Sequence, residues 1–213
     1  MKSRYIGVCF GVFILLASCQ QEIDWGIITV SANDYQPVSA NSQWAYTSTS
    51  SGNFTVKSIG TDSIISGRNY YKFDRTGSGA TSRYYVNKTG NVYRQYALFP
   101  LASQVIDLLY LKDSSVGTTW TNTITVSGLS SYHKYTVAAR GLQRVVNGTT
   151  FNNVIELNYQ FSLDNPFGVG AINAGGGKNY YAKGVGAIES FYTIGYFAVN
   201  ISDTTKLTSY TIY

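Results

Sequence analysis

Few side chains in this sequence have the chemistry of a catalyst. The single histidine, His133, lies in a strand-like stretch, where a lone histidine is most often a packed or surface residue. Glycoside hydrolysis needs two carboxylates about 5–10 Å apart, and Glu156 and Glu189 are the obvious pair because both lie in strand-like stretches. Glu156 falls on the polar side of its stretch, so a solvated surface explains it as well. This pair is therefore the enzymatic alternative.

Other reaction classes lack the residues they require. A metal site needs several His, Cys, Asp or Glu residues at ligand spacing, and no such group occurs, so we expect neither a metal nor a cofactor. No Gly-x-Ser-x-Gly nucleophile elbow is present. The glycine-rich stretch 164–178 fails as a phosphate loop, because Lys178 is followed by Asn179 and a strand-like segment rather than a helix. We predict a flexible surface loop there and no catalytic residue.

Aromatic side chains are the remaining candidates for recognition. The chain has 19 tyrosines, and three adjacent pairs stand in strand-like segments at Tyr70-Tyr71, Tyr84-Tyr85 and Tyr180-Tyr181. Successive strand residues point to opposite faces, so one ring of each pair should enter the core while its neighbour faces outward. Outward rings can pair across strands, or they can bind a sugar ring or a protein partner. The candidate binding residues are Tyr71, Tyr85, Tyr181 and Trp120.

The segments that position these residues have the pattern of β-strands. Between Phe151 and Ser162, apolar residues occupy every second position from Ile155 to Phe161, which indicates one buried and one wet face. Similar segments rich in Thr, Tyr, Val and Ile alternate with turns of Gly, Asn, Ser and Asp. About a dozen such segments at regular spacing predict an all-β, antiparallel architecture.

The strand-like segments also repeat. An apolar pair precedes a turn in both copies, at Ile64-Ile65-Ser66-Gly67 and at Val145-Val146-Asn147-Gly148. Each turn glycine follows an aromatic residue, Phe54 or Tyr135, by thirteen positions. Asn-Gly favours a tight hairpin because a type I′ turn needs positive φ at both central residues. We therefore expect two antiparallel meanders that form a β-sandwich, an open curved sheet or a barrel.

The amino terminus has the layout of an export signal. Lys2 and Arg4 supply a positive start, Ile6 to Leu16 form an apolar run, and a small-residue cleavage site follows. As a helix this run would be roughly 18 Å long, short of the ~30 Å hydrocarbon core of a bilayer. We therefore expect a cleaved leader rather than a membrane span.

The sequence Leu16-Ala17-Ser18-Cys19 resembles the lipobox of bacterial lipoproteins. In that class a diacylglycerol is attached to the cysteine sulfur, cleavage occurs just before the cysteine, and the new amino terminus is acylated by fatty acids such as palmitate. The resemblance implies an envelope protein held at the outer membrane through Cys19, on its periplasmic face or at the cell surface. It also implies the following organisation: signal peptide 1–18, lipidated Cys19 and tether 19–40, and one β domain 41–213 with halves at about 44–111 and 120–213.

Composition restricts the partners of the mature chain. Cys9 lies in the leader and Cys19 is the expected anchor, so no disulfide forms within the mature chain and stability must come from packing. The formal net charge of +5 includes Lys2 and Arg4 and falls to about +3 without the leader. The remaining basic residues are scattered singly, which argues against nucleic acid. Abundant Ser, Thr, Asn and Tyr favour a neutral partner, such as a glycan or an envelope protein.

A longer pattern is similar to one found in uncharacterised Bacteroidota lipoproteins. It comprises Val146-Asn147-Gly148-x-x-Phe151 followed by Tyr180-Tyr181-Ala182-Lys183-Gly184-Val185-Gly186, and it covers most of residues 41–192. The resemblance implies location and fold class, and no activity. The leading hypothesis is a non-catalytic binding or structural domain anchored to the membrane. The alternatives are a hydrolase using Glu156 and Glu189, or a curved sheet that carries lipid in an apolar cavity.

Overall fold

The computed structural model describes the chain from residue 33 to residue 213, apart from residues 78, 100–103, 127, 169 and 197–198. The predicted leader, Cys19 and the predicted tether up to residue 32 lie outside the described residues. The core draws its side chains from Tyr35 to Ile212. A chain that begins at Gln20 therefore keeps every contact described below.

The described residues form twelve strands. Their bounds are β1 Gln43–Ser48, β2 Gly52–Ile65, β3 Arg68–Gly77, β4 Ala80–Thr89, β5 Val92–Phe99, β6 Gln104–Lys112, β7 Thr119–Val126, β8 Leu129–Val146, β9 Thr149–Asp164, β10 Ala171–Ala182, β11 Gly186–Tyr196 and β12 Val199–Thr211. The predicted all-β fold of about a dozen strands is confirmed. Within the part of the chain that the structure describes, no helix is long and apolar enough to cross a bilayer.

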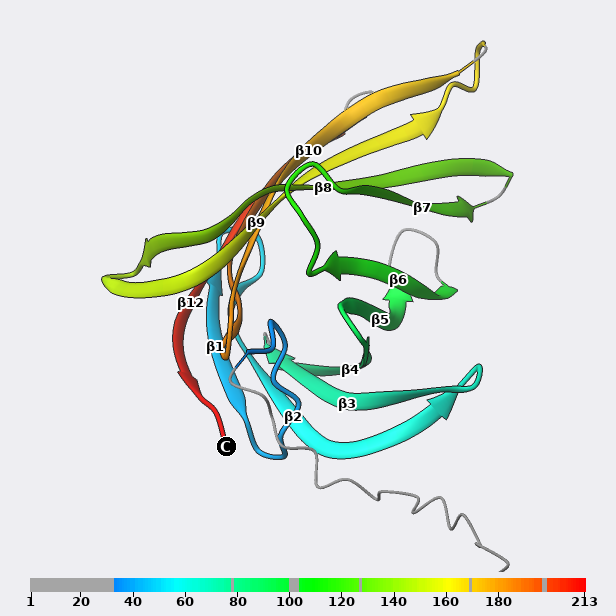
Figure 1. Ribbon diagram of the computed structural model, residues 1–213. Coiled ribbons are helices and arrows are strands. Elements are labelled where there is room, and N and C mark those ends of the chain that lie inside the picture. The colour runs from blue at the N-terminus through cyan, green and yellow to red at the C-terminus, as the bar shows by residue number, and fades with distance from the viewer. Residues whose placement is uncertain (1–32, 78, 100–103, 127, 169, 197–198) are drawn as a thin grey trace, which may run out of the picture.

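All twelve strands belong to one antiparallel sheet, in the order β6-β5-β4-β3-β2-β1-β12-β11-β10-β9-β8-β7. Two six-stranded meanders, β1–β6 and β7–β12, are therefore joined where the first strand pairs with the last. The sheet curls until its two edge strands, β6 and β7, approach each other (Figure 1). Of the architectures predicted, the curved, nearly closed sheet is the one observed.

Side chains, rather than a backbone ladder, join β6 to β7. The amide of Leu109 donates to Asn122 Oδ1 at 3.0 Å, and Asn122 Nδ2 donates back to the Leu109 carbonyl at 3.0 Å. Trp120 Nε1 donates to the same carbonyl at 2.8 Å. Gln104 Nε2 reaches the carbonyl of Thr125 at 3.2 Å. These side-chain hydrogen bonds hold the two edge strands together.

The two repeated turns are hairpins of the predicted kind. Ser66 and Gly67 join β2 to β3 with φ of 50° and 75°, and Asn147 and Gly148 join β8 to β9 with φ of 47° and 81°. Positive φ at both central positions is the type I′ requirement. Both hairpins connect the second and third strands of their meander, so the sequence repeat corresponds to a structural repeat.

The glycine-rich stretch is mostly strand, and the prediction of a flexible loop there was wrong. Residues from Ala171 onward form β10, which pairs with β9 and β11. A Cβ on Gly176 would overlap the carbonyl oxygen of Tyr159, and one on Gly177 would overlap that of Phe191. These glycines therefore allow close approach of neighbouring backbones, which is a recognised use of glycine within strands.

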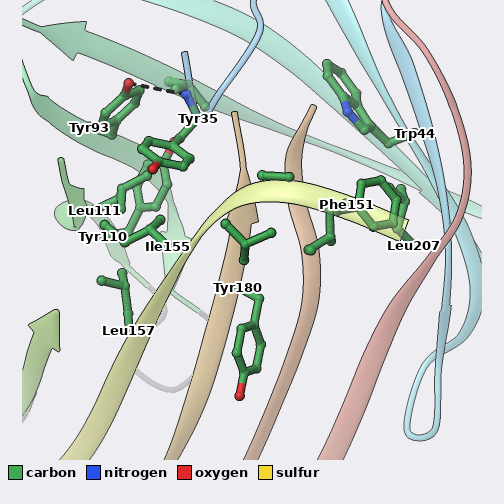
Figure 2. Packing of buried hydrophobic residues seen from close by; sticks show 14 of the residues in the cluster. Tyr35, Trp44, Tyr93, Tyr110, Leu111, Phe151, Ile155, Leu157, Tyr180 and Leu207 are labelled. Atoms are coloured by element: carbon green, nitrogen blue, oxygen red, sulfur yellow. Dashed lines mark hydrogen bonds between the residues drawn. The ribbon is translucent and has the colours of Figure 1, made fainter. Parts of the chain in front are cut away.

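Residues 34–40, which we expected to be tether, pack against the sheet. The side chain of Tyr35 is 1% exposed, and its amide donates to the hydroxyl of Tyr93 at 3.3 Å (Figure 2). The Asp34 carbonyl accepts from the amide of Gly184 at 2.7 Å, and the Val38 carbonyl accepts from Ser58 Oγ at 2.7 Å. These contacts make residues 34–40 part of the packed domain.

Candidate functional site

A cavity of about 250 Å³ lies on the concave side of the sheet. Strands of both meanders contribute to its wall, which requires the sheet to curve around it. The lining residues are Gln36, Trp44, Tyr46, Val56, Tyr84, Val86, Gln95, Leu108, Tyr110, Tyr135, Asn179, Tyr181 and Ala187.

Aromatic rings make up much of the cavity wall. Two of them are held by hydrogen bonds to the backbone: Trp44 Nε1 donates to the Val185 carbonyl at 2.6 Å, and the Tyr46 hydroxyl donates to the Ala187 carbonyl at 2.9 Å. The ring centroids of Tyr110 and Tyr181 lie 5.9 Å apart, within the usual range for aromatic pairs. The wall is therefore built in advance of any ligand.

Five tyrosine hydroxyls of this wall stay protonated at neutral pH. Burial raises the pKa of each above its ordinary value of 10.0, because a phenolate is poorly solvated away from water. A protonated hydroxyl can donate one hydrogen bond and accept others. The residues concerned are Tyr46, Tyr84, Tyr110, Tyr135 and Tyr181.

One of these hydroxyls has no partner. The side chain of Tyr110 is 8% exposed, and its hydroxyl oxygen is buried without a hydrogen bond to any described residue. A buried polar group that lacks a partner costs about 1–3 kcal/mol. The cavity thus offers this hydroxyl as an unused donor to a bound molecule.

The cavity contains no formal charge in its described wall. Its other polar groups are the side-chain amides of Gln36, Gln95 and Asn179. A phosphate, carboxylate or ammonium group would have to enter without a counter-ion, which is expensive away from water. The wall therefore favours an uncharged ligand with hydroxyl or carbonyl groups.

The sequence-predicted aromatic residues separate onto two faces. Tyr181 lines the cavity. Tyr71 pairs directly with the cavity-lining Val86, so it faces the same side. Tyr85 is on the outer face, with its ring centroid 6.2 Å from that of Tyr96. Tyr85 is therefore the outward ring of its pair, whereas Tyr71 and Tyr181 are the inward rings of theirs.

Trp120 is 7% exposed, and its ring stacks on Tyr135 at 5.5 Å between centroids. It therefore packs beside the cavity wall, on the same face of the sheet as Tyr135, rather than offering a surface platform. Sequence reasoning missed Tyr46, Tyr84, Tyr110 and Tyr135 as members of the site. The alternation of strand faces was the available signal, but it needs the register of each strand before it identifies a face.

The acidic pair Glu156 and Glu189 is brought together on the outer face. Each is paired across a strand with Tyr180, one on each side, so their backbones are about 10 Å apart. Lys178 Nζ lies 2.6 Å from Glu156, and Arg144 Nε donates to Glu189 at 2.6 Å.

The guanidinium of Arg144 also lies 3.4 Å from the ring centroid of Tyr180. Both acids are thus neutralised in ion pairs around a central tyrosine. This arrangement accounts for the pair as a structural network on the outer face. Figure 2 shows Tyr180 pointing away from Tyr35, Tyr93 and Tyr110.

His133 is also a packed residue. Its Nδ1 lies 2.9 Å from the Tyr159 hydroxyl and its Nε2 lies 3.2 Å from Ser131 Oγ. Burial lowers the pKa of His133 to about 4, so the imidazole is neutral. Among the described residues there is no group of three or more His, Cys, Asp or Glu side chains that could hold a metal.

Comparison with known proteins gives a fold relative. No family model matches this chain, and no curated protein matches it. A solved structure from Parabacteroides distasonis, described as a "putative lipoprotein", superposes with a TM-score of 0.50 at 9% sequence identity. The match covers 83% of this chain and 98% of the other. This chain therefore shares its fold with a Bacteroidota protein that carries a lipoprotein description.

Proposed function

We propose that this protein is a non-catalytic lipoprotein of the bacterial envelope whose β domain binds a small uncharged glycan unit in the concave cavity. The buried, unpartnered hydroxyl of Tyr110 is the observation that carries the binding proposal. It stands in an uncharged wall of aromatic rings. A ligand hydroxyl would satisfy that group and recover the energy lost in burying it.

A single sugar ring fits this wall in size and chemistry. Ligand pockets for drug-sized molecules commonly measure ~300–1,000 Å³, and a cavity of about 250 Å³ is slightly smaller, which suits a ligand of one ring. The C–H face of a sugar can lie on a tyrosine ring while its hydroxyls meet phenol and amide groups. A long acyl chain suits the cavity less well, because amides and hydroxyls interrupt its apolar surface.

Calorimetric titration of the chain from Gln20 onward tests the proposal. The probes are glucose, galactose, mannose and N-acetylglucosamine, each compared with glucose 6-phosphate and glucuronic acid. We expect at least one neutral sugar to bind and the charged sugars to bind more weakly. Tyr110→Phe should weaken binding about tenfold and raise the free energy of unfolding by about 1 kcal/mol, because the unpartnered hydroxyl is gone.

Tyr85→Phe is the matched control, since it removes a phenol hydroxyl from the outer face. It should leave binding unchanged. Failure of every neutral sugar to bind would overturn the proposed ligand. Equal effects of the two substitutions would show that the cavity hydroxyl has no role in recognition.

The anchoring part of the proposal rests on Cys19 and the preceding Leu16-Ala17-Ser18. In cells fed labelled palmitate, we expect the full-length protein to carry the label and to sediment with outer membranes. Cys19→Ser should lose the label and leave the membrane fraction, whereas Cys9→Ser, within the leader, should change neither. A labelled Cys19→Ser protein would contradict the assignment.

A further inference from the structure

A second hollow, of about 180 Å³, lies at one end of β2, β3 and β4, which are neighbours in the sheet (Figure 1). Its lining residues are Ser51, Phe54, Arg75, Gly77, Ala80 and Ser82. Glycine and alanine have side chains too small to fill the space, so the recess beside Arg75 stays open.

The register of the strands places this hollow on the same side of the sheet as the cavity. Arg75 lies directly opposite Val56, which lines the cavity, and directly opposite residues face the same side. Ser82 of the hollow and Tyr84 of the cavity wall are two residues apart in β4, so they share a face at a spacing of about 7 Å. The hollow and the cavity therefore adjoin on the concave side.

The guanidinium of Arg75 is held over an aromatic ring. Its Cζ lies 4.0 Å from the ring centroid of Phe54, which is the geometry of a cation–π contact. Phe54 in turn stacks on Tyr46 of the cavity wall, with 5.1 Å between the ring centroids. Burial raises the pKa of Tyr84, and the positive charge of Arg75 partly offsets this rise. The charge is therefore fixed beside the cavity and acts on its wall.

Within the described chain, Arg75 has no carboxylate partner, whereas the other arginines there all form ion pairs. Those others are Arg68, Arg83, Arg94, Arg140 and Arg144. Asp203 also faces the concave side, opposite Tyr192, but its oxygens accept hydrogen bonds from Ser48 and Thr205. Because Arg75 is half-buried, its charge lacks part of the hydration it would have in water and gains from an anionic neighbour.

We propose that Arg75 binds the carboxylate of an acidic sugar unit linked to the neutral unit in the cavity. A planar guanidinium presents paired N–H donors that match the two oxygens of a carboxylate. One guanidinium balances one negative charge, which favours a carboxylate over a phosphate monoester, whose charge at pH 7 is about −1.5 to −2. This inference rests on the proposed binding of a neutral sugar and names the class of its neighbouring unit.

The position of the charge on the ligand decides whether it meets Arg75. A carboxylate on the ring inside the cavity would lie against an uncharged wall, where it lacks a counter-ion. A carboxylate on the next ring would lie in the adjoining hollow. The ligand class is therefore an oligosaccharide with a uronic acid next to a neutral sugar, rather than a free acidic monosaccharide.

Calorimetric titration of the chain from Gln20 onward with paired disaccharides tests the inference. Each pair joins either glucuronic acid or glucose to the same neutral sugar, which is glucose, galactose, mannose or N-acetylglucosamine. In at least one pair, we expect the acidic member to bind about tenfold more tightly, and this preference should shrink as sodium chloride is added. Arg75→Gln should abolish the preference without changing the affinity for the neutral member. Arg75→Lys keeps the charge but loses the paired donors, so it should retain part of the preference.

Arg83→Gln is the matched control. It removes the same charge from the neighbouring strand, but on the outer face, where Arg83 pairs with Asp74. This variant should keep the preference for the acidic member, and circular dichroism should show that all three variants fold. A merely structural role of Arg75 would lower stability without changing the ratio of acidic to neutral affinity.

Acidic members that bind no more tightly than their neutral partners in every pair would overturn the inference. A preference that Arg75→Gln leaves intact would overturn it as well. The cavity proposal fails separately, because Tyr110→Phe should weaken both members of a pair equally. Acidic binding that depends on Arg75 but not on Tyr110 would contradict the cavity proposal and support the site at Arg75.

Discussion

At the scale of single residues, the concave side of the sheet buries polar groups that must remain neutral. His133 is 4% exposed and Tyr159 partners its ring. Its pKa of about 4 lies below the ordinary value of 6.5 because burial disfavours the charged imidazolium. The unfolded chain, in contrast, binds a proton below about pH 6.5. The folded protein therefore excludes a proton that the unfolded chain accepts.

Stability should consequently fall in mild acid. The contribution of neutral His133 is complete above about pH 6.5 and decreases as the pH drops toward 4, because the unfolded state binds more protons in that window. Urea unfolding at pH 7, 6, 5 and 4 should show a loss of about 2 kcal/mol. His133→Gln should make the free energy of unfolding nearly constant across this range.

The carboxylates whose pKa is lowered do not contribute to the loss of stability in this pH window. Hydrogen bonds lower the pKa of Asp74 and Asp164 below the ordinary value of 3.8, so their contributions are lost only as the pH falls below about 4. A His133→Gln protein that keeps the wild-type slope between pH 6.5 and 4 would contradict the assignment to His133.

The orientation of the paired tyrosines was predictable from the sequence only in part. Paired tyrosines correctly indicated that one ring of each pair faces inward. They did not indicate which ring, because both neighbours are the same residue type. The inward ring is the first residue in the pair Tyr84-Tyr85 and the second residue in the pair Tyr180-Tyr181. A register shift between Tyr180 and Tyr181 is the kind of local feature that a repeat pattern does not reveal.

At the scale of elements, the junction of β1 with β12 depends on one buried carboxylate. Asp203 is 6% exposed. It accepts hydrogen bonds from Ser48 Oγ at 2.7 Å, from the Ser50 amide at 2.9 Å and from Thr205 Oγ1 at 2.8 Å. Burial alone would raise the pKa of Asp203, but these bonds outweigh it and hold the pKa well below its usual range. The carboxylate thus ties the β1–β2 turn to β12.

Removing this carboxylate should loosen the junction of the two meanders. Asp203→Ala should lower the free energy of unfolding by about 3 kcal/mol, because several buried donors lose their acceptor. Asp203→Asn keeps one carbonyl acceptor and should cost about half as much. Denaturant unfolding at pH 7 measures both variants.

The exposed Asp62 supplies the comparison, and Asp62→Asn should change stability by less than about 0.5 kcal/mol. If Asp203→Ala were no more destabilising than Asp62→Asn, the carboxylate would not hold the junction.

Strands and turns were the most predictable features at this scale. The Asn147-Gly148 hairpin followed from backbone sterics alone, and the alternation after Phe151 correctly located β9. The strand from Ala171 was hidden by its glycines, which normally disfavour strands. Glycine is needed in β10 because the backbones of β9 and β11 approach it closely. This is a tertiary constraint that cannot be read from the residue types. The bridging role of Asn122 at the sheet edge has the same origin.

At the scale of the whole molecule, the curved sheet separates two chemical environments. The concave side holds neutral hydroxyl and amide groups, and the outer face holds the ion pairs around Tyr180. A neutral sugar in the cavity would therefore lie apart from these charged groups. The all-β architecture was predictable from the sequence. The choice of a curved sheet over a sandwich was not, because it depends on whether the first and last strands pair with each other.

The pairing of β1 with β12 has a consequence for biosynthesis. During synthesis β1, the first strand of the sheet, lacks one of its two neighbours until β12, the last strand, has been made. The two meanders therefore cannot join until every strand between them has left the ribosome.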